Sequence, residues 1–343
     1  MPRQPLLPLA LPLALCLLPA CVIFDPGGDD GGDDATYGDP SGPTSGPTSG
    51  PTSGPTSGWN PTSAGESTST TAPIEPTGAD NEPEAGCPCA PGTDLIYVLS
   101  DIGVLWSFDP IEHTFTRLAA ITCGGMTDTF SMGVSRKARA WIQFQSGDLY
   151  TVDLNDPSDP IPCKDPGFIP PNDPKFANFG MAFVANSLGD PCDRLYAHSA
   201  TEPGLYGPGV GGLGAIDPQT LLLAAIAPID YAWGELTGSG DGRLFAYAGA
   251  APPLLIEYDK ADGLALDVLP LPALGGDSAF AFAWYGGDFF LFIDPDPFGN
   301  ISQVWHLDYD QSDGGKQALT FLGDAPIRVV GAGVSTCVPW GPT

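Results

Sequence analysis

The chain has 343 residues, with 41 acidic and only 12 basic side chains, which gives a net charge of -29 at pH 7. Because proteins that bind nucleic acid need lysine and arginine to displace counterions from phosphates, this balance excludes nucleic acid as a partner. Composition changes sharply near residue 87, and only the part beyond it carries enough apolar residues for a core. We therefore expect one folded domain over residues 87–343, in a monomeric protein.

Residues 1–20 have the layout of an export signal. Arg3 precedes an apolar run over residues 6–18, and about 13 residues are fewer than the roughly 20 that cross a bilayer. The segment from Leu18 to Cys21 resembles the bacterial lipobox, although Pro19 is not the commonest choice there. The resemblance implies a lipid on Cys21, which anchors the chain in the membrane. An ordinary signal peptide with an incidental cysteine is the alternative.

Val22, in place of aspartate after the cysteine, implies the outer membrane of a Gram-negative bacterium by analogy with lipoprotein sorting. Residues 21–86 are then the lipidated cysteine and a tether rich in Gly, Pro, Thr, Ser and Asp, in which the tetrad GPTS repeats over residues 41–58. So few apolar residues cannot offset the conformational entropy that ordering would cost. We expect the tether to be disordered.

A five-residue pattern recurs in the folded part: an aliphatic residue, two variable residues, a bulky apolar residue and an aspartate. The five copies end at Asp109, Asp153, Asp217, Asp259 and Asp308. Each copy follows β-branched and aromatic residues and precedes turn residues, so each predicts the third strand of a small antiparallel sheet. Strand-rich repeats of roughly 40 to 60 residues predict an all-β β-propeller, because one such sheet cannot bury both of its faces alone.

The C-terminal segment from Ile327 to Val334 has the pattern of an inner strand, and the first repeat lacks an inner strand. We expect this segment to complete the first blade, which closes a ring of five four-stranded blades and removes exposed sheet edges. Small residues recur in the inner strands, where the sheets converge on a narrow axis; they include Gly133, Ala182, Gly238 and Gly333. A six-bladed ring is the alternative, with a degenerate blade between Asp153 and Phe179.

Six cysteines remain after Cys16 and Cys21, an even number that predicts three disulfides in an exported chain. Cys337 follows the closing strand, while Cys87 and Cys89 precede the strand beside it. We expect one of that pair to bond Cys337 and the other to bond Cys192. The remaining pair, Cys123 and Cys163, flanks the second blade. A metal site at Cys87-Pro88-Cys89 is the alternative, but it lacks the usual spacing.

Few residues indicate chemistry. The aspartates that end the repeats are expected to cap turns, with a ring of metal ligands as the alternative. Asp294, Asp296 and Asn300 have the residue types of a calcium loop, but two prolines interrupt it, so we predict no cofactor and keep calcium as a weak alternative. Glu235 lies in an inner strand, where its carboxyl group either faces the axial channel or binds local backbone donors. Five tryptophans in the blades are expected to pack between sheets, with sugar stacking as the alternative; they are Trp106, Trp141, Trp233, Trp284 and Trp305.

The lipobox, the GPTS tether, the strings LIYVLS, FSMGVS and GSGDGRLFAY and the ending GAGVSTC are together similar to those of lipobox-anchored β-propeller lipoproteins from large-genome Gram-negative bacteria. This resemblance covers nearly the whole chain and implies a fold and an anchor, not an activity. A looser similarity to gluconolactonase-like and quinoprotein-like propellers rests on the strand pattern alone, and the metal ligands of the lactonases have no counterpart here.

The leading hypothesis for function is a surface-tethered, non-enzymatic propeller that binds a protein or a glycan through loops at one end of the ring. A metal-dependent hydrolase or lactonase with its site in the axial channel is the second hypothesis. The third is a structural component of the cell envelope. A propeller fold is compatible with all three.

Overall fold

A computed structural model describes residues 86–217, 220–249, 252–274, 279–296, 299–309 and 317–341. The predicted signal segment, Cys21 and residues 22–85 of the predicted tether lie outside these ranges. The described chain consists of β-strands and one short 3₁₀ helix, η1 (Pro174–Phe176). Within these ranges no helix has the length and apolar character needed to cross a membrane.

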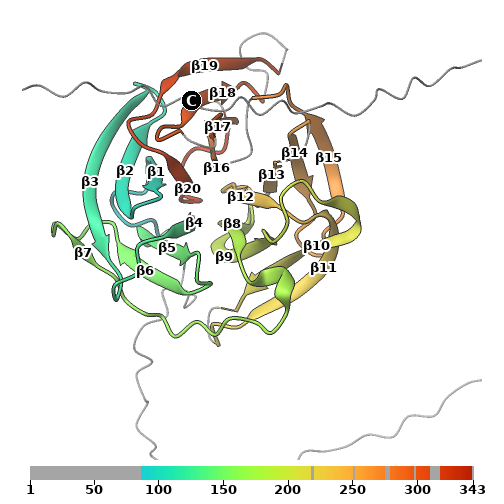
Figure 1. The fold of residues 1–343 in the computed structure, drawn as a ribbon, viewed down its shortest axis with the longest axis horizontal. Coiled ribbons are helices and arrows are strands. Elements are labelled where there is room, and N and C mark those ends of the chain that lie inside the picture. The colour runs from blue at the N-terminus through green and yellow to red at the C-terminus, as the bar shows by residue number, and fades with distance from the viewer. Residues whose placement is uncertain are drawn as a thin grey trace, which may run out of the picture. The chain divides into compact units, whose positions relative to one another are not determined.

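The strands form five sheets arranged as the blades of a propeller (Figure 1). Blade one is β20 (Val329–Val334), β1 (Ile96–Ser100), β2 (Val104–Asp109) and β3 (Thr114–Thr122), with β7 (Ile161–Pro162) beside β3. Blade two is β4 (Thr129–Val134), β5 (Arg139–Phe144) and β6 (Leu149–Asp153). Blade three is β8 (Phe179–Ser187), β9 (Asp190–Ser199), β10 (Tyr206–Ile216) and β11 (Leu223–Tyr231). Blade four is β12 (Gly234–Gly238), β13 (Leu244–Ala248), β14 (Leu254–Tyr258) and β15 (Ala265–Pro270). Blade five is β16 (Ala279–Tyr285), β17 (Asp288–Asp294), β18 (Gln303–Leu307) and β19 (Leu319–Asp324).

The ring closes through the C-terminal strand, as the sequence predicts. β20 pairs antiparallel with β1, with Ile96 opposite Val334 and Leu99 opposite Gly331. The inner strands then contact one another around the axis in the order β20, β4, β8, β12, β16 and back to β20. The five-bladed propeller is therefore confirmed.

The long connection between β6 and β8 contains only β7 and η1, so it forms no sixth blade. Ile161 of β7 pairs in parallel with Ile121 of β3 and extends blade one at its outer edge. In blade two, the position outside β6 is occupied by Lys164, which forms an isolated antiparallel bridge with Thr151. The extra residues of this connection thus cover the edges of two neighbouring blades.

Small residues let the inner strands approach closely at the axis. A Cβ atom on Gly180 of β8 would lie 2.2 Å from the carbonyl oxygen of Gly234 in β12. On Gly238 of β12, a Cβ atom would lie 2.2 Å from the carbonyl oxygen of Phe183 in β8. Both distances are too short for any side chain, so these two strands require glycine where they meet.

Farther from the axis, aromatic side chains fill the space between neighbouring blades. Phe108 of blade one meets Phe292 of blade five edge to face, with 5.6 Å between ring centroids. Trp141 of blade two packs against Phe183 of blade three at 6.1 Å. Each such contact buries apolar faces that a single sheet leaves exposed, which is the main stabilising contribution in a propeller.

Four of the five aspartates that end the repeats cap the turns after their strands, as predicted. In four of the five, a carboxylate oxygen accepts backbone N–H bonds two or three residues ahead; these are Asp109, Asp153, Asp217 and Asp259. The fifth, Asp308, is buried. The repeated carboxylates therefore serve the local turns.

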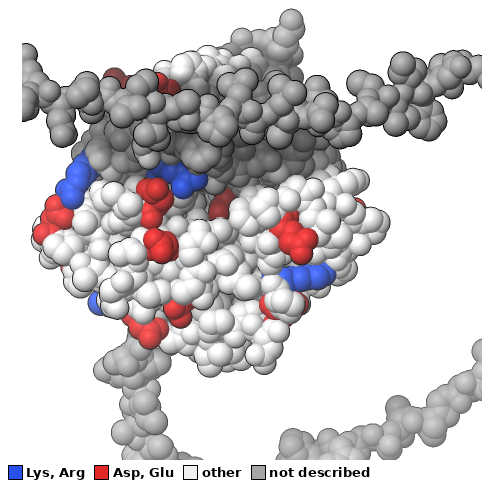
Figure 2. Space-filling view, in the orientation of Figure 1, with Lys and Arg blue, Asp and Glu red and all other residues white. Residues whose placement is uncertain are grey.

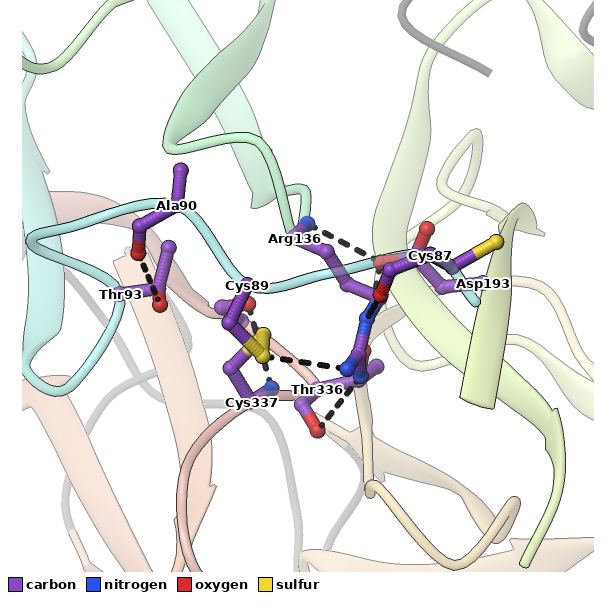
Figure 3. Close-up of a disulfide and its surroundings, with 9 residues drawn as sticks. Cys87, Cys89, Ala90, Thr93, Arg136, Asp193, Thr336 and Cys337 are labelled. Carbon is purple, nitrogen blue, oxygen red and sulfur yellow. Dashed lines mark hydrogen bonds between the residues drawn. A yellow bond between two sulfur atoms is a disulfide. The ribbon is translucent and has the colours of Figure 1, made fainter. Parts of the chain in front are cut away.

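Two of the three disulfides of the described residues lie at the first described residues, and Figure 3 shows the one between Cys89 and Cys337. Cys89 bonds Cys337, just beyond β20, and Cys87 bonds Cys192 of β9. The third bond joins Cys123 and Cys163 beside blade two. Of the two partners left open for Cys337 by the sequence, the structure selects Cys89.

Arg136, in the turn after β4, ties this entry segment to the ends of the inner strands. Its Nε donates to the carbonyl oxygen of Cys87 at 2.9 Å, and its Nη1 donates to Oγ1 of Thr336 at 3.0 Å. Asp193 Oδ2 accepts from the Arg136 backbone N–H at 3.1 Å and from the Thr336 hydroxyl at 3.3 Å. Burial raises the pKa of Asp193 to about 6, partly opposed by these donors. We call these three residues and the two disulfides beside them the clasp.

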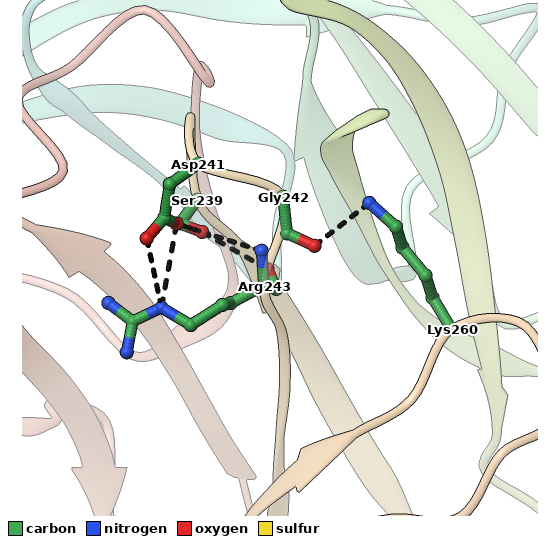
Figure 4. Close-up of polar contacts among 5 residues, drawn as sticks. All are labelled: Ser239, Asp241, Gly242, Arg243 and Lys260. Atoms are coloured by element: carbon green, nitrogen blue, oxygen red, sulfur yellow. Dashed lines mark hydrogen bonds and ion pairs between the residues drawn. The ribbon is translucent and has the colours of Figure 1, made fainter. Parts of the chain in front are cut away.

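A second polar junction lies at the same end of blade four (Figure 4). Asp241, in the turn between β12 and β13, accepts from the hydroxyl of Ser239 and from Nε of Arg243. The Arg243 guanidinium carbon lies 4.6 Å from the Trp284 ring centroid in blade five. The Lys260 ammonium donates to the carbonyl oxygens of Gly242 and, in blade three, of Ala185 and Asn186. The junction around this turn therefore links blades three, four and five.

Charged side chains do not gather on one part of the surface shown in Figure 2. Acidic and basic groups are scattered there among uncharged residues, with the acidic groups more numerous. The part of this face where described residues are visible therefore shows no single charged patch.

Candidate ligand-binding site

A cavity of about 370 Å³ lies at the axis, at the end of the ring where the inner strands begin. Its wall combines residues that start inner strands with residues of the turns between second and third strands. The lining consists of Asp101, Ile102, Asp128, Thr129, Phe130, Gln145, Ala200, Trp233, Gly234, Glu235, Ala279, Phe280, Arg328 and Val330. The clasp lies at the opposite end, because Arg136 and Thr336 follow inner strands β4 and β20. We call this cavity the axial pocket.

Three aromatic side chains form the apolar part of the axial pocket. Trp233, just before β12, stands at its centre, with the Phe130 ring 5.9 Å away and the Phe280 ring 6.4 Å away, both edge to face. The three residues come from blades two, four and five, so only the closed ring brings them together. Edge-to-face contacts fix the orientation of the indole and keep its exposed part available to a ligand.

Glu235 is the acid of the axial pocket. It belongs to β12 and is only 6% exposed, and its Oε2 accepts a hydrogen bond from the Ser131 hydroxyl of β4 at 2.8 Å. The carboxyl group passes over Gly180 of β8, where a Cβ atom would come within 3.0 Å of Oε2. Burial raises the pKa of Glu235 well above its usual value, while the Ser131 hydroxyl and the Met181 backbone oppose that shift. The Glu235 side chain therefore lies among the inner strands of blades two, three and four.

Arg328 is the basic side chain of the axial pocket, and acidic neighbours neutralise it. Its Nε donates to Asp294 Oδ2 at 2.7 Å, and its Nη1 lies 3.7 Å from Asp101 Oδ2. Asp294 is fully buried, so the closer of these two ion pairs is shielded from water. With Asp128 at the rim, the charge around the axial pocket is negative on balance, and an anionic ligand is disfavoured.

The weak calcium candidates have other partners in the structure. Asp294 Oδ2 binds Arg328, and Asp294 Oδ1 accepts the backbone N–H of Asp296 at 3.1 Å. Asn300 is exposed. Across the described chain, no group of three or more His, Cys, Asp or Glu side chains is placed to hold a metal ion.

Sequence reasoning identified Glu235 as a channel candidate but missed the other polar residues of the axial pocket. Asp101 and Gln145 lie in turns between second and third strands, and Asp128 lies just before an inner strand. Aligning the five repeats and comparing the residues that precede each inner strand would have drawn attention to Trp233 and Phe280. Asp101 and Gln145 have no comparable pattern in their local sequence, because only the closure of the ring brings them together.

One similar solved structure is the extracellular domain of a putative hybrid two-component system from B. thetaiotaomicron, with 10% sequence identity and a TM-score of 0.36. The match covers 70% of this chain and 30% of that chain, so this protein spans less than a third of its length. No protein-family model and no curated protein sequence matches the chain.

Proposed function

We propose that the protein is a non-enzymatic binding module that takes a neutral glycan in the axial pocket and is held at the cell surface by a lipid on Cys21. The observation that carries this proposal is the pairing, in one cavity, of the aromatic group around Trp233 with the oxygen-bearing side chains of Asp128, Gln145 and Glu235. Sugars present apolar C–H faces to aromatic rings and hydroxyl groups to carboxylates and amides. The axial pocket offers partners for both.

The size and charge of the axial pocket support the same class of ligand. Cavities of about 300 to 1,000 Å³ that combine apolar walls with a few polar groups are typical of small-ligand sites, and this one measures about 370 Å³. That volume suits one or two sugar rings. Because the charge balance disfavours anions, we propose neutral sugars in preference to uronic acids, sulfated sugars or phosphates.

The lipobox at residues 18–21 supports the proposed anchor. The first described residues, at Cys87 and Cys89, lie at the end of the ring opposite to the axial pocket. Metabolic labelling with palmitate, compared between wild type and Cys21→Ser, tests the anchor.

A glycan array tests the ligand class, and calorimetry with the best neutral hits measures their affinity. Trp233→Ala should lower affinity at least tenfold, because ring stacking and the shape of the wall are both lost. Asp128→Asn should weaken binding less, and it leaves the core untouched because the side chain is exposed. Trp340→Ala is the matched control: this tryptophan is 47% exposed and lies near Gly240, at the clasp end.

Loss of binding in Trp340→Ala equal to that in Trp233→Ala would contradict the placement of the site. An array on which acidic glycans bind and neutral glycans do not would contradict the ligand class. A thermal melt of each variant separates a folding defect from a binding defect, and Asp128→Asn covers the case in which Trp233→Ala does not fold.

A further inference from the structure

A pair of stacked tyrosines lies on blade three, at the end of the ring that holds the axial pocket. Tyr206 begins β10 and Tyr231 ends β11; the two residues are register partners, with ring centroids 4.9 Å apart and planes inclined by 29°. Tyr206 is 64% exposed, and Leu205 beside it is 41% exposed. These two side chains therefore present apolar surface to solvent at the end of the ring that holds the axial pocket.

Backbone hydrogen bonds connect this pair directly to the wall of the axial pocket. Ala200 and Trp233, which both line the axial pocket, form an antiparallel bridge. Next to that bridge, Thr201 N–H donates to the Ala232 oxygen at 3.0 Å, and Ala232 N–H donates to the Leu205 oxygen at 3.2 Å. Trp233 follows Tyr231 by two positions, which is roughly 7 Å of extended chain. The backbone that carries the tyrosine pair is thus hydrogen-bonded to the backbone beside Trp233.

The polar groups around the tyrosine pair match those of the axial pocket. Asp230 is exposed next to Tyr231, and its Oδ1 accepts the backbone N–H of Gly209 at 3.2 Å, which holds the carboxylate in place. Glu202 is exposed on the segment that precedes Leu205. Both carboxylates can accept hydrogen bonds from hydroxyl groups, and neither favours an anion.

We propose that Tyr206 and Tyr231 form a second sugar subsite, so that the ligand is an oligosaccharide whose end enters the axial pocket and whose next units lie over blade three. This inference rests on the proposed function and specifies it further: the ligand is a chain and not a single sugar. The exposed face of Tyr206 receives the second or third ring by stacking, and Asp230 orients its hydroxyl groups.

Calorimetry with cello-, malto- and chito-oligosaccharides of one to four units tests the inference on the purified protein. In the series that binds, affinity should rise about tenfold between the monosaccharide and the tetrasaccharide, because stacking on the tyrosine pair adds to the interactions in the axial pocket. Tyr206→Ala should abolish this gain and leave the affinity for the monosaccharide unchanged. Tyr206→Phe keeps the ring and should keep most of the gain, and Trp340→Ala should change neither value.

Affinity that does not depend on chain length, or a gain that persists in Tyr206→Ala, would overturn the second subsite while leaving a monosaccharide site in the axial pocket. Absence of binding to every saccharide on the array would overturn the proposed function, and the subsite with it. Because Tyr206 is exposed, its replacement does not disturb the core, and a thermal melt verifies this for each variant.

Discussion

Replacement of Glu235 by glutamine tests the defining polar feature of the axial pocket, a carboxyl group buried among three inner strands. Burial raises the pKa of Glu235 well above its usual value of 4.5, so the folded protein keeps this proton at pH values where the unfolded chain has released it. In that pH window the folded state binds more protons than the unfolded state. The stability of the wild-type protein should therefore fall as pH rises from about 4.5 to the folded pKa.

The expected magnitude follows from the release of one proton. Each pH unit within the window changes the free energy of unfolding by about 1.4 kcal/mol. Glutamine retains an oxygen that can accept from the Ser131 hydroxyl but has no proton to release. Between about pH 4.5 and the folded pKa, the free energy of unfolding of Glu235→Gln should thus rise relative to that of wild type by about 1.4 kcal/mol per pH unit. This corresponds to about 4 °C in Tm per pH unit for a domain of this size. Below about pH 4.5 the two proteins should be equally stable.

Urea unfolding, followed by tryptophan fluorescence with the disulfides intact, measures this difference from about pH 4 to about pH 8. Because wild type and variant share every other titrating group, including Asp193, the difference isolates Glu235. Glu112→Gln is the matched control, since this side chain is exposed between β2 and β3. Parallel curves for wild type and Glu235→Gln at all pH values would refute the reasoning, because they require a carboxyl group that titrates alike in the folded and unfolded states.

Three further changes test the fold that carries the site. Burial lowers the pKa of His198 to about 4 from 6.5, so acidification between these values should cost roughly 3 kcal/mol of stability; His198→Gln should remove that loss in the same urea experiment. The double change Cys89→Ser and Cys337→Ser opens the largest loop and should lower the free energy of unfolding by about 5 kcal/mol, and equal stability with wild type would argue against this bond as the closure of the ring. Gly180→Ala places a Cβ atom 2.2 Å from a carbonyl oxygen and should cost at least about 1 to 3 kcal/mol, whereas Gly341→Ala, with open space at its Cβ, should leave the melting temperature unchanged.

The architecture could be predicted from the sequence because each blade repeats the same local pattern. The bulky residue and the aspartate at the end of each copy determine where a strand meets its turn, and Asp109 shows this in its bonds to the backbone of Ile111 and Glu112. The match between the Ile327–Val334 segment and the inner strands predicted the closure of the ring. β7 carries no comparable pattern: its two residues pair in parallel with β3, and this contact is set by the path of a long connection.

The candidate site was far less predictable, for a physical reason. Glu235 could be found because it is an acid within an otherwise small and apolar inner strand. Gln145, Asp101 and Arg328 come from three different connections, and nothing in their local sequence distinguishes them from ordinary turn residues. Their proximity results from the closure of the whole ring, which sequence patterns of one blade do not encode. The same holds for Arg136, whose partners lie in three separate parts of the chain.

The clasp has a mechanical consequence for a protein held by its N-terminal segment. A pull transmitted through the chain before residue 87 reaches two covalent bonds first, Cys87–Cys192 and Cys89–Cys337. The load passes into β9 and into the end of β20, at two points of the ring. It therefore does not peel β1 away from its neighbours one hydrogen bond at a time. At the cell-surface anchor proposed above, such a load would be borne by these two sulfur–sulfur linkages.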